Sequence, residues 1–201
     1  TTLRGHQASF ISTLLSGREA WPTYARQEQK LDSFHMRCLR RVLRIHWQDM
    51  VPNTEVLERA RTTSIAAILR ERRLRWLGHV RRMDPGRIPK DLLYGELTEG
   101  TRSTGRPHLR FKDVCKRDMK LCNIDTTFWE NLVEDRSSWR SAVGSGVRLY
   151  EEARITILVE RRAGRKARES QPQRSSDFVC SKCCKDCHSR IGLYSHSRRC
   201  Q

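Results

Sequence analysis

The sequence predicts a mainly α fold, in which a basic body of helices is followed by a small ββα unit at the carboxyl end. Apolar residues recur at helical spacing through most of residues 25–163, and no alternating strand pattern is longer than four or five residues before the terminal unit. The last stretch, Phe178 to Gln201, holds five of the eight cysteines. We expect four segments: the remnant of a preceding region at 1–24, the basic helical body at 25–163, a flexible linker at 164–177 and the terminal unit at 178–201.

The composition indicates a polyanionic partner. Forty Lys and Arg residues against 23 Asp and Glu give a formal net charge of +17, which attracts polyanions at long range and favours contacts to phosphates. Nucleic acid is therefore the first partner to expect, although such charge can also serve solubility alone. The low mean hydropathy of -0.72 indicates that part of the chain is a solvated tail or linker.

Targeting signals are not evident. No stretch approaches the roughly 20 apolar residues that cross a bilayer, and nothing at the start resembles a signal peptide. The chain begins at Thr1 without a Met, so we expect a fragment. Cysteines grouped at metal-ligand spacing, without a secretory context, predict reduced thiols and an intracellular protein, nuclear or cytoplasmic.

Three helices are predicted in the first half of the body. They are a basic amphipathic helix from Tyr24 to Trp47, a short helix in VPNTEVLERA, and a helix from Thr63 or Ser64 to the turn Asp84-Pro85-Gly86. Their arginines are expected mostly away from the apolar faces, where they form a phosphate-tracking groove or are simply solvated. The apolar face of the first helix comprises Leu31, Phe34, Cys38, Val42 and Ile45, and that of the third comprises Ile65, Leu69, Trp76, Val80 and Met83. The apolar run Phe10 to Leu15 has no evident partner.

Three more helices are predicted in the second half, after an exposed loop at 98–108. The first has Phe111, Val114, Cys115, Asp118 and Cys122 on one side. The next is capped at Asp125 or Thr127, with Thr127 and Glu130 spaced as a capping box, and its apolar side comprises Trp129, Leu132, Val133, Trp139 and Val143. The last runs from Val147 to Ala163 and gives way to the polar linker.

The terminal cysteines have the spacing of a metal site. Cys180 and Cys183 are separated by two residues, twelve residues follow to His196, and three more lead to Cys200. A Cys-x2-Cys turn places two thiolates on one side of a knuckle, and a His and a Cys four apart share one face of a helix, so the four side chains suit tetrahedral Zn²⁺. Because Leu193 also stands where a ββα finger has its core leucine, we predict a zinc finger.

Three neighbouring residues leave alternatives open. Cys187 falls where such fingers usually bury a Phe, which predicts a small apolar core residue. Cys184 lies at the tip of the knuckle, where φ is positive and Gly is common. Together with His188 they complicate the ligand set, since either thiol can substitute as a ligand or oxidise. A disulfide scaffold requires an oxidising compartment, for which the sequence gives no indication.

The finger offers few side chains that read bases. Its base-facing helix positions fall on Ser189, Gly192 and Ser195, none of which makes the bidentate pairs that distinguish guanine or adenine. We expect the basic residues to bind the phosphate backbone of a nucleic acid with little sequence specificity. The predicted nucleic-acid contacts are Arg40, Arg41, Arg72, Arg73, Arg81, Arg82, Arg106, Arg110, Lys112, Lys116, Arg190, Arg198 and Arg199.

Two other nucleic-acid signals are weaker. Gly105-Arg106-Pro107 is part of a minor-groove motif, but Thr104 replaces its first Arg, and a plain turn is favoured. Trp76, Trp129 and Trp139 can stack on bases, but their positions on apolar helical faces favour core packing.

An enzyme is not expected. A metal-dependent nuclease or polymerase needs at least two carboxylates that converge on Mg²⁺. Asp91, Asp118 and Lys120 can be aligned with a nuclease pattern, but Asp118 and Lys120 are two apart on a predicted helix and face away from each other. His79, next to Trp76, is favoured as a helix-surface residue rather than as a catalytic base.

Five ordered motifs resemble the carboxy-terminal region of the endonuclease and reverse transcriptase polyprotein of non-LTR (LINE-like) retrotransposons. The similarity extends from about Ser9 to Cys200. The motifs are RRLRWLGHVRRM (72–83), GRIPKDLLYGEL (86–97), TGRPHLRFKDVCKRDMK (104–120), WENLVEDRSSWR (129–140) and CHSRIGLYSHSRRC (187–200). Relatives often have Tyr at the position of Ser16 and usually have Gly at the position of Cys184.

The resemblance implies a segment that follows the polymerase, with thumb-like helices and a finger that help to hold the element's RNA or the target DNA during target-primed reverse transcription. FISTLLSGREAWPTY resembles the end of the polymerase region, so residues 1–24 are interpreted as its remnant. The family's catalytic carboxylates, including its Tyr-x-Asp-Asp pair, precede this region. The resemblance therefore implies binding without catalysis.

The sequence thus predicts non-catalytic binding of RNA or DNA by a retrotransposon-derived fragment with Zn²⁺ as cofactor. Neither a membrane nor a small-molecule substrate is expected. A protein-interaction adaptor, in which the charge only maintains solubility, is the main alternative, and a decayed copy without function is a third.

Overall fold

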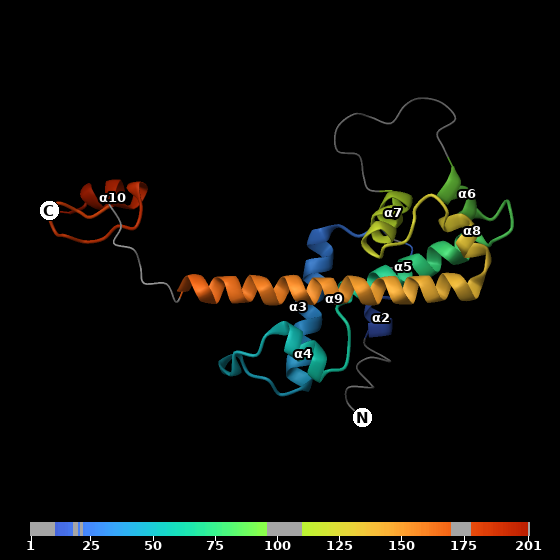
Figure 1. The fold of residues 1–201 in the computed structure, drawn as a ribbon, viewed down its shortest axis with the longest axis horizontal. Helices are drawn as coiled ribbons and strands as arrows, with labels where there is room; N and C mark the ends of the chain where they lie inside the picture. Colours follow the sequence, from blue (N-terminus) through green and yellow to red (C-terminus); the bar gives the residue numbers. More distant parts are fainter. Residues whose placement is uncertain (1–10, 18–19, 21, 96–109, 170–177, 201) are drawn as a thin grey trace. The chain divides into compact units, whose positions relative to one another are not determined.

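The computed structural model describes residues 11–17, 20, 22–95, 110–169 and 178–200, and this part of the chain is mainly α, as predicted (Figure 1). Two units are distinguished, within Thr1–Ile155 and Thr156–Gln201, and helix α9 contributes residues to both. The helices are α2 (Ser12–Leu14), α3 (Ala25–Val42), the 3-10 helix η3 (Trp47–Asp49), α4 (Asn53–Arg59), α5 (Ile65–Arg81), α6 (Ile88–Tyr94), α7 (Phe111–Leu121), α8 (Trp129–Glu134), α9 (Arg136–Glu169) and α10 (Arg190–Ser197).

Some predictions fall outside the described residues. These are Phe10, the loop at 98–108 with its Arg106, and residues 170–177 of the linker. The beginning of the linker was placed wrongly, because α9 continues through residues 164–169 instead of ending at Ala163. Ala, Arg, Lys and Glu dominate this stretch and are strong helix formers, so low apolar content alone did not indicate a break.

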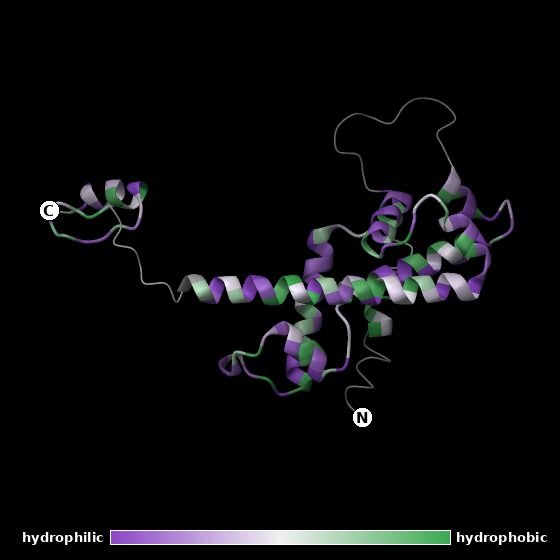
Figure 2. Cartoon of the chain, viewed as in Figure 1, coloured by the Kyte–Doolittle hydropathy of each residue, from purple (hydrophilic) through white to green (hydrophobic). Residues whose placement is uncertain are grey.

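Helix α5 is the centre of the first unit. It packs against α3, α6, α7 and α8, and it contributes to the largest apolar cluster together with residues of α9. The predicted start is confirmed, since the hydroxyl of Ser64 accepts a hydrogen bond from the backbone N–H of Ala67 at 3.2 Å. The helix ends before the predicted turn, in which Gly86 adopts a φ of +80°. Figure 2 shows apolar and polar residues interleaved along α5 rather than in two clean stripes.

Two arginines of α5 are buried, which contradicts their predicted place on a solvent-facing side. Arg73 is 0% exposed, and its guanidinium lies 2.7 Å from Asp118 of α7 and 3.1 Å from Glu28 of α3. It also donates a hydrogen bond to the hydroxyl of Thr23 at 2.7 Å. Arg70 lies 3.5 Å from the same Asp118. The buried carboxylates explain the burial of the arginines, because an unpaired charge is very costly inside a protein.

Helix α9 replaces two predicted helices. A single helix was expected from about Thr127 through Val143, with another beginning at Val147, but the chain breaks at Asp135 and then continues as one helix from Arg136 to Glu169. Asp135 explains the break, because its carboxylate accepts hydrogen bonds from the backbone N–H groups of Ser137 and Ser138 at 3.0 and 3.1 Å. The hydroxyl of Ser138 also donates to this carboxylate, as does that of Ser137; the Ser138 hydroxyl first, and then the other three hydrogen bonds, lower the pKa of Asp135 to about 2.

Helix α9 is fixed to α5 at two points. The backbone N–H and the hydroxyl of Ser64 both donate to the carboxylate of Glu151, at 3.1 and 2.7 Å. Further along, the indole N–H of Trp139 donates to the carbonyl of Leu74 at 3.0 Å. The ring sits directly against Gly78, where an added Cβ would lie 2.3 Å from the indole nitrogen. The absence of a side chain at Gly78 is therefore what allows the two helices to approach.

The amphipathic face of α3 differs from the predicted one. Phe34 is 41% exposed, whereas Leu31, His35, Met36 and Leu39 are buried. Leu31 packs in a cluster with Ile11, Leu15, Ile65 and Leu69, so the apolar run before α3 does have a partner, contrary to the prediction.

The shorter helices agree only in part with those predicted from the sequence. The predicted helix in VPNTEVLERA is confirmed as α4, although no side chain caps it. Helix α6 was not predicted, and its Leu93 joins the main cluster. The predicted apolar side of α7 is largely confirmed, with Val114, Cys115, Asp118 and Cys122 buried and Phe111 half-buried.

We expect Asp118→Asn to destabilise the first unit by about 3–5 kcal/mol, because it leaves the buried guanidinium of Arg73 without its closest carboxylate. Urea denaturation measures the change. The control is Glu55→Gln, which breaks the half-exposed pair between Glu55 and Arg59 and is expected to cost about 1 kcal/mol at most. Equal effects of the two substitutions would contradict the structural role of Asp118.

We expect Gly78→Ala to destabilise the protein by about 1–3 kcal/mol, because its Cβ would force Trp139 away from α5. Gly144→Ala provides the control, since it is also helical but has open space around its Cβ position; it should be stabilising by roughly 0.5–1 kcal/mol. Thermal unfolding followed by circular dichroism measures both. Effects of the same sign would mean that the contact between Gly78 and Trp139 is not close.

Candidate metal centre

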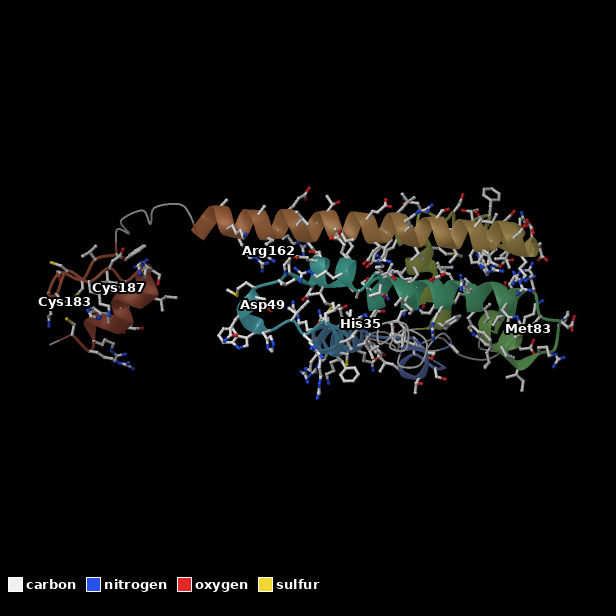
Figure 3. All side chains as sticks on the ribbon, turned by 90° about the horizontal axis from the view of Figure 1, so that it is seen from below. His35, Asp49, Met83, Arg162, Cys183 and Cys187 are labelled. Atoms are coloured by element: carbon white, nitrogen blue, oxygen red, sulfur yellow. The ribbon has the colours of Figure 1, made fainter. Side chains whose placement is uncertain are left out.

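A tight turn carries the first two cysteines of the terminal unit. The backbone N–H of Cys184 donates to the carbonyl of Cys180 at 2.9 Å, which closes the turn, and the N–H of Cys180 donates to the carbonyl of Lys185 at 2.9 Å. Cys184 adopts a φ of 56°, as predicted for the knuckle tip. Figure 3 labels Cys183 and Cys187, which lie on the loop segments of this unit.

The two predicted strands are not observed among the described residues. A single antiparallel bridge joins Val179 to Asp186, and the N–H of Cys187 donates to the carbonyl of Phe178 at 3.0 Å. The knuckle turn occupies the residues between these two positions, so the ladder does not extend toward the turn.

Helix α10 carries the third predicted ligand. The hydroxyl of Ser189 caps it by accepting a hydrogen bond from the N–H of Gly192 at 3.0 Å. Gly192 passes close to the knuckle, because an added Cβ would lie 2.4 Å from the carbonyl oxygen of Cys187. His196 lies in the last turn of the helix. Cys200 lies beyond the helix end, but its N–H still bonds the carbonyl of His196 at 2.9 Å, which maintains the spacing of a helical turn.

The four predicted ligands come together. The Sγ atoms of Cys180, Cys183 and Cys200 and a ring nitrogen of His196 all lie within 4.8 Å of one another. The Sγ of Cys183 is 3.0 Å from Nε2 of His196. Bond lengths of about 2.3 Å to sulfur and 2.0–2.1 Å to nitrogen place tetrahedral ligands roughly 3.5–3.8 Å apart, so the cluster is compact enough for one ion. Among the described residues it is the one group of this kind.

The protein environment favours ionisation of one thiol in particular. The pKa of Cys180 is lowered to about 6, chiefly because the backbone N–H groups of Cys183 and Lys182 point at its sulfur. The pKa of Cys200 is raised to about 11, first by a hydrogen bond with Cys183 and then by burial. Since a metal binds thiolates, an ion that enters displaces the proton from Cys200.

The neighbouring candidates lie outside the cluster. Cys187 is half-buried, in partial agreement with its predicted core position, and its thiol lies 3.6 Å from the carbonyl oxygen of Lys185. Cys184 is exposed, and the imidazole of His188 lies 3.5 Å from the carboxylate of Asp186. All eight cysteines are free thiols.

Several predicted nucleic-acid contacts have other partners inside the body. Arg73 is buried, as described above, and its assignment to nucleic acid was wrong. Arg40 donates to the carbonyl of Val51 and to the side chain of Asn53, both at 2.8 Å. Arg81 lies 3.5 Å from Glu130 and 3.3 Å from Glu134. The charges of Arg73 and Arg81 are therefore already matched.

The remaining predicted contacts lie at the surface. Arg72 and Arg82 are half-buried on α5 and border hollows in its surface. Lys112 lies 5.2 Å from the ring of Tyr94, and Arg198 lies 5.6 Å from that of Tyr194. The exposed members are Arg41, Arg110, Lys116, Arg190, Arg198 and Arg199. Arg75, Arg136 and Arg140, which were not predicted as contacts, border the same hollows as Arg72 and Arg82.

The tryptophans and Asp118, which the sequence also offered as functional residues, mostly have structural roles. Trp129 and Trp139 are buried in the core, as predicted, whereas Trp76 is half-buried at its edge and reaches the surface. Asp118 is fully buried and bound to two arginines, so the alignment with a nuclease pattern fails on geometry.

The chain matches no protein family, no curated protein and no solved structure. Within the described residues, none of the helices has the length and apolar character needed to span a bilayer.

Titration with Co²⁺ tests the ligand set, because tetrahedral thiolate complexes of this ion absorb strongly in visible and near-ultraviolet light. We expect one ion to bind per chain with the spectrum of a three-thiolate, one-imidazole site. Cys183→Ser should lower the thiolate charge-transfer absorbance by about one third, in proportion to the lost ligand, and weaken binding. Cys184→Ser is the control, since this neighbouring thiol lies outside the cluster. A larger loss from Cys184→Ser would overturn the assignment.

Proposed function

We propose that the chain binds nucleic acid without catalysing a reaction on it, and that zinc keeps its terminal unit folded. The observation that carries the proposal is the cluster of Cys180, Cys183, His196 and Cys200, next to exposed arginines on the same small unit. The net charge of +17 supports a polyanionic partner.

The donor set favours Zn²⁺ among the common metal ions. Three thiolates and one imidazole are soft and borderline ligands, which suit Zn²⁺ and disfavour Mg²⁺ or Ca²⁺. All four positions are supplied by the protein, as in structural sites, so no open position is left for a substrate. The bridge between Val179 and Asp186, followed by α10, supports the order of elements of a ββα finger.

The terminal unit depends on its metal because its apolar core is small. Cys180 is its one buried residue among those described, while Phe178 and Leu193 are only half-buried. Apolar burial alone does not offset the conformational entropy that such a unit loses on folding. The free energy of metal binding therefore supplies most of its folding free energy. We infer that the zinc-free terminal unit is unfolded while the first unit keeps its structure.

The exposed arginines of the terminal unit suit a nucleic-acid backbone. Arg190 is the first residue of α10, and Arg198 and Arg199 follow its last turn. Side chains at the predicted base-facing positions are short or absent, so this unit contacts phosphates and has little means of choosing a sequence.

The resemblance to non-LTR retrotransposon polyproteins gives the proposal a biological setting, in which this segment holds element RNA or target DNA beside a polymerase. The shared motifs supply structural contacts: residues 72–83 form most of α5, and residues 129–140 form α8 and the start of α9. Arg73, Gly78 and Trp139, which fix the core, fall within these motifs. This supports a common helical body but says nothing of catalysis.

A protein-interaction adaptor is the second candidate. The observation that favours it is the exposure of Ile191 and Tyr194 on α10, at 79% and 64%. Apolar side chains this exposed suit a protein partner. They equally suit stacking on unpaired bases in the case of Tyr194, so salt dependence distinguishes the two functions.

The test is fluorescence anisotropy of the zinc-loaded chain with labelled single-stranded RNA, single-stranded DNA and duplex DNA across a salt series. Backbone binding predicts that log K falls linearly with log salt, with a slope of about -0.7 per phosphate contacted on a single strand, and that probes of different sequence bind alike. Binding independent of salt, or no binding at low salt, would overturn the proposal. A sharp sequence preference would overturn the backbone mode alone.

A further inference from the structure

The exposed side of α5 carries a basic and aromatic surface that the proposed function does not yet use. Arg72, Arg75, Trp76, His79 and Arg82 occupy about one third of the helix circumference, given 3.6 residues per turn. They lie on two adjoining rows, Arg72–Trp76–His79 and Arg75–His79–Arg82, each with helical spacing of four and three residues. The opposite side of the helix forms the core.

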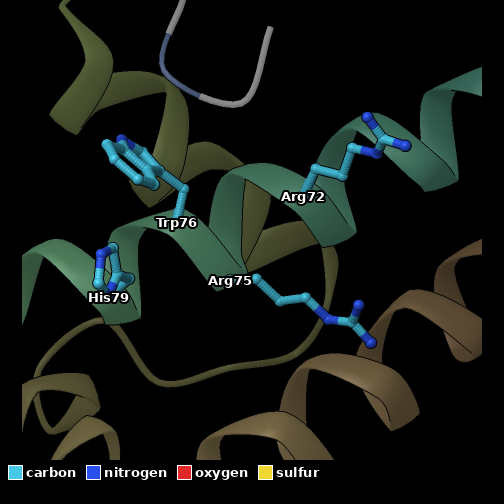
Figure 4. Close-up of a pocket in the computed structure, with 4 residues that line it drawn as sticks. All are labelled: Arg72, Arg75, Trp76 and His79. Carbon is cyan, nitrogen blue, oxygen red and sulfur yellow. The ribbon is translucent and has the colours of Figure 1, made fainter. Parts of the chain in front are cut away.

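Two adjoining hollows lie along this surface. The first, of about 300 Å³, is bordered by Arg72, Arg75, Trp76 and His79, and Figure 4 shows all four side chains projecting from α5. The second, of about 460 Å³, lies between α5 and the start of α9 and is bordered by Arg75, His79, Arg82, Arg136, Trp139 and Arg140. Arg75 and His79 border both hollows, so the two are adjacent, and together we call them the arginine groove.

Among the described residues, no carboxylate borders the arginine groove. Arg75 lies 2.7 Å from Glu71, but that pair is half-exposed and within one helix, and such pairs contribute little. Arg72 donates to the carbonyl of Leu15 at 3.3 Å and Arg82 to that of Val133 at 2.8 Å. One hydrogen bond of this kind orients a guanidinium, and four of its five N–H groups remain for another acceptor.

The aromatic residues give the groove a second property. Trp76 packs against the core on one side and is half-buried, and its ring centroid lies 5.3 Å from that of His79 at an angle of 51°. The two rings therefore provide an apolar surface among cations. Trp139 is 1% exposed and is held by its bond to Leu74, so it contributes a rigid wall rather than a mobile contact.

We propose that the arginine groove binds a single-stranded nucleic acid, with its phosphates on Arg75, Arg82, Arg136 and Arg140 and a base stacked on Trp76. The planar guanidinium of arginine can donate two parallel hydrogen bonds to a pair of phosphate oxygens. Stacking of an unpaired base on an indole ring contributes about 1–3 kcal/mol per base to binding, whatever the base. Duplex DNA can supply the phosphates but not the base, since its bases are already stacked within the helix. The inference rests on the proposed function, for which it names the main binding surface on the first unit.

The first test neutralises charge in the groove. Arg136→Gln with Arg140→Gln removes two exposed arginines four residues apart near the start of α9, and Arg161→Gln with Arg165→Gln removes an equally spaced, exposed pair on the same helix as the control. We expect the groove variant to bind single strands about 10-fold more weakly, with the salt slope reduced by roughly 1 to 2. The control pair should change the affinity by no more than about 2-fold and leave the salt slope unchanged. Equal losses from the two pairs would show a diffuse charge effect and overturn the groove.

The second test concerns stacking. Trp76→Leu is compared with Trp47→Leu, which removes an 81% exposed tryptophan on η3, away from the groove. We expect Trp76→Leu to weaken single-strand binding about 10-fold, with duplex binding and the salt slope unchanged. A loss that is equal on duplex and single strand, or equal to that of Trp47→Leu, would overturn the stacking role. Circular dichroism melting confirms that each variant is folded.

The failure of this inference is distinguishable from failure of the proposed function. If the unaltered, zinc-loaded chain binds nucleic acid with a steep salt slope but the groove variants behave like their controls, the function stands and the groove is overturned. If the unaltered chain binds none of the probes at low salt, the function is overturned and the groove with it.

Discussion

The buried guanidinium of Arg73 is the interaction on which the packing of the first unit depends. It joins three helices at one point, through Asp118 of α7, Glu28 of α3 and its own position on α5. Burial alone would lower the pKa of Arg73, but the two carboxylates more than offset this effect and raise it. The charge therefore persists in the interior, and loss of Asp118, its closest carboxylate, leaves it only partly compensated by Glu28. An apolar contact would tolerate small shifts between the helices, whereas this network does not.

This network also decides which arginines remain for a partner. The net charge includes every arginine equally, yet the guanidinium groups of Arg70 and Arg73 are already paired with Asp118 and Glu28 inside the first unit. With those two side chains turned inward, Arg72, Arg75 and Arg82 lie together on the other side of the helix and at its end, where they border hollows in the surface. One helix thus uses the same residue type for a structural purpose on one side and, as we propose, for binding on the other. Burial and carboxylate partners separate the two roles, and residue type alone does not.

The sequence predicted features that depend on local chemistry. Ser64 caps α5 and Cys184 takes a positive φ because each requires only its immediate neighbours, and the metal cluster follows from ligand spacing along a short segment. Features that depend on distant partners were missed. The burial of Arg73 requires Asp118, forty-five residues away along the chain, and the break at Asp135 requires knowing that its carboxylate caps rather than continues a helix. Helical periodicity places a side chain on a face but does not say what the face meets.

The two units of the chain owe their stability to different physics, and this bears on how binding responds to metal. The first unit buries a large apolar cluster and a charged network, neither of which involves the metal cluster. The terminal unit has scarcely any buried apolar surface, from which we infer that it depends on ion binding for its fold. On the proposed function, removal of the metal therefore abolishes the contacts of the terminal arginines and leaves the arginine groove intact. We accordingly propose that the metal modulates nucleic-acid affinity in degree rather than abolishing it, since each unit would contribute its own phosphate contacts.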